Sequence, residues 1–258
     1  MTTLIHPTAI VDPGAILGDD VEIGPFAIIG PEVAIGDGCR IGPRAIVRWT
    51  RMGKGCFVGA NSIVGGDPQF YNWKQVPSWV ELGDNVFINE LVAIHRAGYE
   101  GKSTRIGDKC YIMTQSHIAH DCVIGREVTI TTLAGLSGHI EVGDYAVIGG
   151  SAGLHQHVRV GTMAMVGGMT RIVQDVPPCF MVVGNPSRPE GLNTVGMKRR
   201  GVGPDDRLRM KTAYKILVQS GLPPKEAVAR IEVELELVGM VKNLVDFAKV
   251  ESKRGLAV

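Results

Sequence analysis

The chain has 258 residues, enough for one large domain or for a large domain with a small appendage. Its formal net charge of +1 argues against a generally basic surface that binds nucleic acid. Hydrophobic residues make up 45% of the chain and aromatic residues only 5%, so aliphatic side chains must fill the core. No stretch approaches the roughly 20 consecutive apolar residues of a membrane span, so none is predicted.

The N-terminus and the cysteines indicate the cytoplasm. The first residues, "MTTLIHPTAIVDPGAI", place His6, Asp12 and two prolines where a secretory signal needs an apolar run. The five cysteines are odd in number and form no C-x-x-C pair. We therefore expect them to be reduced, buried, small hydrophobic residues, without a disulfide or a zinc ion.

A repeat of six residues runs through most of the chain. From Ile106 to Ile172, every sixth residue is Ile, Leu or Val. The same step holds from Ile5 to Val47 and resumes at Met52 after a slip of one residue. A period of six fits neither a helix nor an ordinary strand, and it is typical of a parallel β-helix.

The physical basis of this pattern is a triangular coil. Each group of six residues forms one short flat face, and three such faces close one coil. The repeating aliphatic side chains point inward, while the glycines that often follow them relieve backbone crowding at the corners. The sequence therefore predicts a mainly β protein, with a triangular β-helical prism over residues 1–190.

Two stretches interrupt the repeat, and a third follows it. Residues 65–79, "GGDPQFYNWKQVPSW", and residues 95–105, "HRAGYEGKSTR", are predicted to be excursions from the prism. Phe70 and Val76 keep the step of six, so a degenerate coil is the alternative for the first. Long loops on a rigid scaffold often carry binding groups. Residues 191–258 form a small α-helical C-terminal domain in this interpretation, with helices over 205–221, 225–239 and 240–252.

Histidines gather in one part of the repeat. Five of the seven lie between residues 117 and 157. Because one coil holds three groups of six, Asp121, His139 and His157 are predicted to stack at one corner of three successive coils. Polar side chains stacked at an edge form a groove rather than a core, so we expect a functional site there.

Base catalysis is the chemistry that this groove favours. His120 stacks on Gly138 and then on Gln156 by the same spacing. A neutral imidazole can remove a hydroxyl proton near neutral pH, and the adjacent Asp121 would fix its tautomer. No serine or cysteine is placed as an obvious nucleophile, so direct attack by a substrate hydroxyl is predicted rather than a covalent intermediate.

Metal binding is the alternative for a histidine cluster on this fold. The gamma-class carbonic anhydrases share the β-helix and bind zinc through an H-x-x-x-x-H pair. No two histidines here are five residues apart, so no metal site is predicted.

Several motifs resemble one family closely. The repeat, together with "SHIAHDC", "LAGLSGHIEVGD", "GGSAGLHQHVRVG", "GNPSRPEGLN" and "MKRRG", is similar to the UDP-N-acetylglucosamine O-acyltransferases that begin lipid A synthesis. The resemblance runs nearly end to end and implies a left-handed β-helix and a cytoplasmic homotrimer. It also implies transfer of a 3-hydroxylated acyl group from acyl carrier protein to the glucosamine 3-hydroxyl, without a cofactor.

The resemblance also implies roles for individual residues. His120 would be the general base, Asp121 would orient it, and the N–H of Gly138 would face the developing oxyanion. Gly168 matches a position that limits the depth of the acyl pocket, which favours a chain of about 12–16 carbons. The implied substrate-binding residues are Gln69, His95, His117, His139, His155, Gln156, Asn193, Arg199 and Arg200.

The chain departs from the family in substrate recognition. The first loop usually carries Gln-Asp-x-Lys, but here Phe70 replaces the acid and Asn72 the base. Val195 stands where the family often has Glu. Loss of these charges costs recognition of a polar acceptor. The second hypothesis is therefore the same transfer to a different nucleotide sugar, for example N-acylation of a 3-amino sugar.

Overall fold

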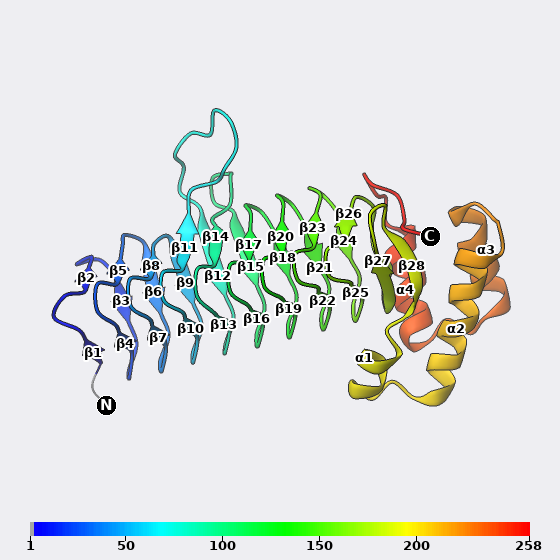
Figure 1. Ribbon diagram of the computed structural model, residues 1–258, viewed down its shortest axis with the longest axis horizontal. Helices are drawn as coiled ribbons and strands as arrows, with labels where there is room; N and C mark the ends of the chain where they lie inside the picture. The colour runs from blue at the N-terminus through cyan, green and yellow to red at the C-terminus, as the bar shows by residue number, and fades with distance from the viewer. Residues whose placement is uncertain (1–2) are drawn as a thin grey trace.

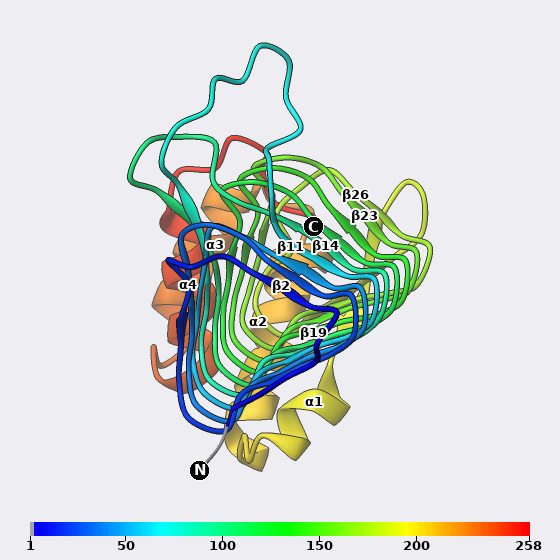
Figure 2. The same cartoon turned by 90° about the vertical axis from the view of Figure 1, so that its left-hand side faces the viewer.

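A computed structural model describes residues 3–258. Over these residues, short strands form three sheets that make the three faces of a triangular prism. Figure 1 shows the prism from the side, and Figure 2 shows its triangular section. Neighbouring strands within each sheet are parallel, except for the final hairpin of β27 and β28. The parallel β-helix predicted from the repeat is confirmed.

The strands are short, and most contain two residues. Sheet A contains β1 (Leu4–Ile5), β4 (Glu22–Ile23), β7 (Arg40–Ile41), β10 (Phe57–Val58), β13 (Phe87–Ile88), β16 (Tyr111–Ile112), β19 (Thr129–Ile130), β22 (Val147–Ile148), β25 (Met165–Val166), β27 (Phe180–Val183) and β28 (Arg188–Leu192). Sheet B contains β2 (Ile10–Val11), β5 (Ile28–Ile29), β8 (Ile46–Val47), β11 (Ile63–Gly66), β14 (Ala93–His95), β17 (His117–Ile118), β20 (Gly135–Leu136), β23 (Gly153–Leu154) and β26 (Arg171–Ile172). Sheet C contains β3 (Ile16–Leu17), β6 (Val33–Ile35), β9 (Thr50–Met52), β12 (Trp79–Leu82), β15 (Ser103–Ile106), β18 (Val123–Ile124), β21 (Glu141–Val142) and β24 (Arg159–Val160).

The register matches the predicted coil of three repeats. His117 pairs with Gly135, and Gly135 pairs with Gly153. The chain passes from sheet A to sheet B to sheet C and back, turning at three corners. We name each corner by the sheets that it joins. The B–C corner holds residues 119–122, 137–140 and 155–158; the A–B corner holds 131–134, 149–152 and 167–170; the C–A corner holds 125–128 and 143–146.

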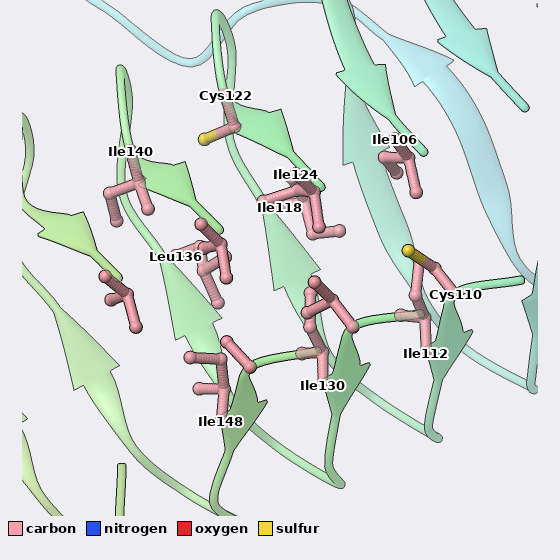
Figure 3. Close-up of a cluster of buried hydrophobic side chains, with 14 of the residues drawn as sticks. Ile106, Cys110, Ile112, Ile118, Cys122, Ile124, Ile130, Leu136, Ile140 and Ile148 are labelled. Carbon is pink, nitrogen blue, oxygen red and sulfur yellow. The ribbon is translucent and has the colours of Figure 1, made fainter. Parts of the chain in front are cut away.

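The core is a column of stacked aliphatic side chains (Figure 3). Each residue of the repeat from Ile106 to Ile172 is at most 3% exposed. A second buried row, two residues earlier in each group of six, holds smaller side chains such as Cys110, Cys122 and Ala134. All five cysteines are buried, as predicted. The paired rows explain why small and large apolar residues alternate along each face, since both must fit between flat sheets.

Truncation of one core isoleucine tests this packing. Ile118 is fully buried between neighbouring coils, so Ile118→Ala is expected to destabilise the protein by about 2–5 kcal/mol through lost contacts and a cavity. Ile10 lies on the first coil and is 64% exposed, which makes Ile10→Ala the matched control. Denaturant unfolding measures both. Equal shifts for the two variants would contradict the inward-facing ladder.

The helical tail covers the end of the prism opposite the N-terminus (Figure 1). It contains α1 (Thr194–Arg199), α2 (Pro204–Gln219), α3 (Pro224–Glu234) and α4 (Gly239–Lys249). None of the helices in residues 3–258 is both long and apolar enough to cross a membrane. The short helix α1 was not predicted, and β28 runs through the boundary placed at residues 190 and 191.

Two segments leave the prism. Residues 67–78, between β11 and β12, carry no strand and project beyond the corner, as Figures 1 and 2 show. Residues 96–102, between β14 and β15, form a second and smaller projection. The two lie side by side, because the Trp73 indole N–H donates to the Gly98 carbonyl and the Ser78 hydroxyl to the Ala97 carbonyl. They stand next to the B–C corner, where the histidines gather.

Candidate functional site

The B–C corner stacks the predicted residues of three successive coils. Asp121, His139 and His157 each occupy the same left-handed turn position, with φ of 60°, 60° and 65°. The N–H of His139 donates to the His120 carbonyl, and the N–H of His157 donates to the Gly138 carbonyl. The rings of His139 and His157 are parallel within 10°, with centroids 4.6 Å apart. The spacing of one full coil thus brings these side chains to one edge.

His120 and Asp121 form a hydrogen-bonded pair. The Nδ1 of His120 lies 2.7 Å from the Oδ2 of Asp121. The same carboxylate oxygen accepts a hydrogen bond of 3.0 Å from the N–H of Gly98. Burial acts to raise the pKa of Asp121, but the hydrogen bonds from His120 and Gly98 outweigh it, so this pKa lies below its ordinary value. An ionised Asp121 holds the proton of His120 on Nδ1 and leaves Nε2 free to accept a proton.

Gly138 lies directly against this imidazole. A Cβ at residue 138 would stand 2.6 Å from Cε1 and 2.7 Å from Nε2 of His120, so a larger residue cannot be accommodated without movement. Within residues 3–258, the N–H of Gly138 donates no backbone hydrogen bond. A free N–H beside the reactive nitrogen of a base is the arrangement that an oxyanion-binding donor requires.

A groove of about 570 Å³ opens beside His120 on sheet B. Gly135 and Gly153, which point outward from β20 and β23, form an open floor because a Cβ at either would meet nothing within 4 Å. Predicted site residues line the groove: Gln69, His117, His120, Gly138, His155 and Gln156. The structure therefore brings these six together.

Asp121, His139 and His157 form an edge along the B–C corner, which we call the histidine edge. A second groove of about 470 Å³ lies on the other side of this edge, on sheet C. Asp121, His139 and His157 line one wall, and the C-terminal segment 251–253 lines another. Lys253 in this segment adds positive charge near His139. The histidine edge thus separates two grooves. His120 lines the groove on sheet B, and Asp121 lines the groove on sheet C.

The other histidines near the base are held neutral. Burial is the main cause that lowers the pKa of His95, His117, His139 and His157 below the ordinary imidazole value. The Nδ1 of His95 lies 2.6 Å from the Asp67 carbonyl, and its ring packs 5.0 Å from that of His117. Neutral imidazoles can both donate and accept hydrogen bonds, which suits them to hydroxyl groups of a substrate.

These lowered pKa values make stability dependent on pH. The unfolded chain binds protons first as the pH falls below about 6.5, while the folded histidines resist protonation. Stability is therefore expected to decrease as the pH falls from about 7 to about 5, before carboxylates titrate. Thermal unfolding over this range measures the effect. His117→Gln should reduce the pH dependence, because it removes one of the histidines whose pKa burial lowers. Stability that is flat or rises towards acid pH would contradict this prediction.

Four of the predicted residues lie away from the B–C corner. Gly168 lies at the A–B corner, next to Gly150. Asn193 is 9% exposed and caps α1, and its amide donates to the Met163 carbonyl. Arg200 pairs with Glu127 and stacks on Tyr145 at the C–A corner, while Arg199 is exposed. The predicted site residues of one chain therefore lie at three different corners of the prism.

Sequence reasoning missed two residues that hold Asp121 in place. Gly98 donates to Asp121, and the Thr104 hydroxyl accepts a hydrogen bond of 2.8 Å from the Asp121 N–H. A polar residue in the second buried row was the available signal for Thr104. Nothing in the spacing of the second excursion identified Gly98, because its partner lies 23 residues away.

One cluster in the described residues also has the composition of a metal site. Ligand atoms of His120, Asp121 and His139 lie within 4.8 Å of one another. These are the same residues that the base-catalysis hypothesis needs, so metal analysis of the purified protein distinguishes the two interpretations. A stoichiometric metal ion would favour the carbonic-anhydrase-like alternative.

Comparison with known proteins agrees with the repeat and with the tail. A family model described as the bacterial transferase hexapeptide, with six repeats, matches residues 103–138. Another, described as domain 2 of UDP-N-acetylglucosamine O-acyltransferase, matches residues 175–257. Residues 3–99 match the GMPPB C-terminal domain. The prism and its transferase repeats define the chain as a hexapeptide-repeat transferase.

Full-length relatives identify the family. The acyl-[acyl-carrier-protein]–UDP-N-acetylglucosamine O-acyltransferase of Thermodesulfovibrio yellowstonii is 42% identical, and that of Syntrophobacter fumaroxidans 43%, each with 98% of both chains covered. LpxA of Acinetobacter baumannii has a TM-score of 0.95 at 35% identity, covering 99% of this chain and 100% of that one. The Bacteroides fragilis enzyme has a TM-score of 0.95 at 33% identity, covering 98% and 99%. The chain belongs to the acyl-[acyl-carrier-protein]–UDP-N-acetylglucosamine O-acyltransferase family.

Proposed function

We propose that the protein transfers a 3-hydroxyacyl chain from acyl carrier protein to the 3-hydroxyl of UDP-N-acetylglucosamine, the first step of lipid A synthesis. The observation that carries this proposal is the pair of His120 and Asp121, 2.7 Å apart at the edge of an open groove, in a chain 42% identical to an enzyme named for these substrates. Acyl carrier protein would supply the acyl chain in the cytoplasm.

The mechanism follows from the hydrogen bonds at this edge. Nε2 of His120 removes the proton of the sugar hydroxyl as its oxygen attacks the thioester carbonyl. Asp121, already ionised, stabilises the imidazolium that forms. The N–H of Gly138 donates to the oxyanion of the tetrahedral intermediate. Collapse of this intermediate breaks the carbon–sulfur bond, and the proton on His120 passes to the leaving thiolate of the carrier. This chemistry needs no cofactor.

A homotrimer is part of this proposal. Arg199, Arg200 and Asn193 lie towards a different corner from the histidines, so a neighbouring copy would have to bring a nucleotide-binding surface to each histidine edge. Exposed apolar side chains along the A–B corner suit contact between copies: Phe26, Leu91, Leu133 and Met169. Light scattering is expected to give three times the 27.7 kDa of one chain. A monomer that is fully active would contradict this arrangement.

The acyl pocket in this proposal passes Gly168. The Gly168 backbone is exposed, and a Cβ at residue 168 would lie 3.3 Å from the Gly150 carbonyl oxygen. Without a side chain, the pocket stays open, and we expect preference for acyl chains of about 12–16 carbons. The rates with acyl carrier proteins that carry chains of graded length measure this preference.

The acceptor has a second candidate. Phe70, Asn72 and Val195 stand where the family carries charged side chains, which favours a different nucleotide sugar, such as one with a 3-amino group. Incubation of the enzyme with 3-hydroxyacyl carrier protein and a panel of nucleotide sugars tests both. Product with UDP-N-acetylglucosamine supports the first candidate. Product with the 3-amino sugar alone would replace it by N-acylation.

A further inference from the structure

A buried arginine fixes the root of the loop of residues 67–78. The Arg96 side chain is 1% exposed. Its Nε and Nη2 donate to the Asp67 carboxylate at 3.1 and 3.0 Å, and its Nη1 donates to the Val76 carbonyl at 3.0 Å. Asp67 and Val76 lie near opposite ends of the loop. One guanidinium therefore closes the loop, and its planar fork satisfies both ends at once.

Two tryptophan rings pack against this guanidinium. Its central carbon lies 4.4 Å from the ring of Trp49 and 4.8 Å from that of Trp73, and Trp79 packs 6.3 Å from Trp49. All three tryptophans of the chain are thus at this loop root. Cation–π contacts with a desolvated guanidinium are stronger than those at an exposed site, so the loop is held by more than its own backbone.

Gly98 connects the loop to the catalytic pair. Its N–H donates to Asp121 at 3.0 Å, and its carbonyl accepts from the Trp73 indole at 3.1 Å. A Cβ at Gly98 would stand 2.5 Å from the ring of Phe70. The ring of Phe70 therefore packs against the Gly98 backbone on one side and near His120 on another.

Phe70 itself covers the base. Its ring centroid lies 4.8 Å from that of His120, edge to face at 62°. It also lines the 570 Å³ groove and remains 38% exposed, so one side is free for a substrate. The neighbouring Tyr71 is 94% exposed and points away from these contacts. An aromatic ring therefore offers an apolar surface to the groove beside the base.

We propose that Phe70 is a specificity-determining residue that binds the C–H face of the acceptor sugar beside His120, and that Arg96 and Trp73 are positioning residues that hold it there. This inference rests on the proposed function and extends it: the acceptor is recognised at this point by an apolar contact instead of by charge. A sugar ring presents apolar C–H groups on its faces, and an ordered aromatic side chain binds them at little cost in conformational entropy.

Calorimetry with UDP-N-acetylglucosamine and with its 3-amino analogue tests this proposal independently of turnover. Phe70→Ala is expected to raise the Kd of whichever sugar the wild type binds by about tenfold. Trp73→Leu should raise it as well, through a displaced loop. Steady-state rates should show a raised acceptor KM, a kcat within about twofold of wild type, and an unchanged KM for the acyl donor. Arg96→Lys should also raise the Kd, because an ammonium lacks the planar fork that holds both ends of the loop.

Tyr71→Ala is the matched control, since it removes an aromatic ring from the same loop without touching His120. It is expected to bind as the wild type does. A Kd unchanged by Phe70→Ala, or a fall in kcat with the acceptor KM unchanged, would overturn the assignment of Phe70 to the sugar. Sugar binding that depends on Phe70 without acyl transfer would instead contradict the proposed function alone. A wild type that binds neither sugar would overturn both.

Discussion

Replacement of His120 by alanine is expected to lower the rate of acyl transfer by about 10²–10⁴-fold, because positioned base catalysis supplies a factor of that size. Among the described residues 3–258, this imidazole is the group that combines a free nitrogen facing the groove with an ionised partner, Asp121, 2.7 Å away. The loss should appear in kcat with acyl carrier protein and the nucleotide sugar both saturating.

Two comparisons make this result interpretable. His6→Ala removes an exposed imidazole from the first coil and should leave transfer unchanged, which excludes a general effect of losing a histidine. Light scattering and thermal unfolding should show that the His120→Ala variant keeps the assembly and fold of the wild type, because this side chain lies at the corner and outside the core. Turnover near the wild-type rate would remove His120 as the base.

Gly138→Ala is expected to lower the rate by about a hundredfold or more, although it adds one methyl group. The new Cβ would stand 2.6 and 2.7 Å from two atoms of the His120 ring, so the imidazole must move. A displacement of about 1 Å in a reacting group costs a factor of this size. The loss should again fall on kcat, since the proposed roles of Gly138 are to donate its N–H to the oxyanion and to leave space for His120.

Gly203→Ala is the control for this substitution. Gly203 has an ordinary φ of −63° before α2, and a Cβ there would meet nothing within 4 Å. It should retain the wild-type rate. A Gly138→Ala variant with normal turnover would show that His120 works from a position other than the one in this structure.

The loop of residues 67–78 carries two of the three departures from the family, and it also lines the candidate groove. The residues proposed as base, partner and oxyanion donor, His120, Asp121 and Gly138, lie on the prism, where the repeat fixes their spacing. Phe70 and Gln69 lie on the projecting loop of residues 67–78, which contains no strand of the prism. Chemistry and acceptor recognition are therefore carried by separate parts of the chain, and recognition can change while the base stays in place.

The sequence by itself determined the prism, the inward ladder and the histidine edge. A repeat of six residues admits one packing, in which Ile118, Leu136 and Leu154 stack in one column, because any other register would expose an apolar row. Once three repeats close one coil, Asp121 and His139 must lie on successive coils at one corner. A local pattern is enough for this result, since every coil repeats the contacts of the one before it.

The tertiary structure decided what the repeat does not encode. The position of Phe70 over His120 depends on Arg96, Trp49 and Gly98, which are joined by contacts between residues far apart in the chain and outside the period. Arg200 lies away from the histidine edge, because the tail brings it to Glu127 at the C–A corner. Such contacts are specific to single side chains and do not recur along the chain, so the spacing of residues could not reveal them.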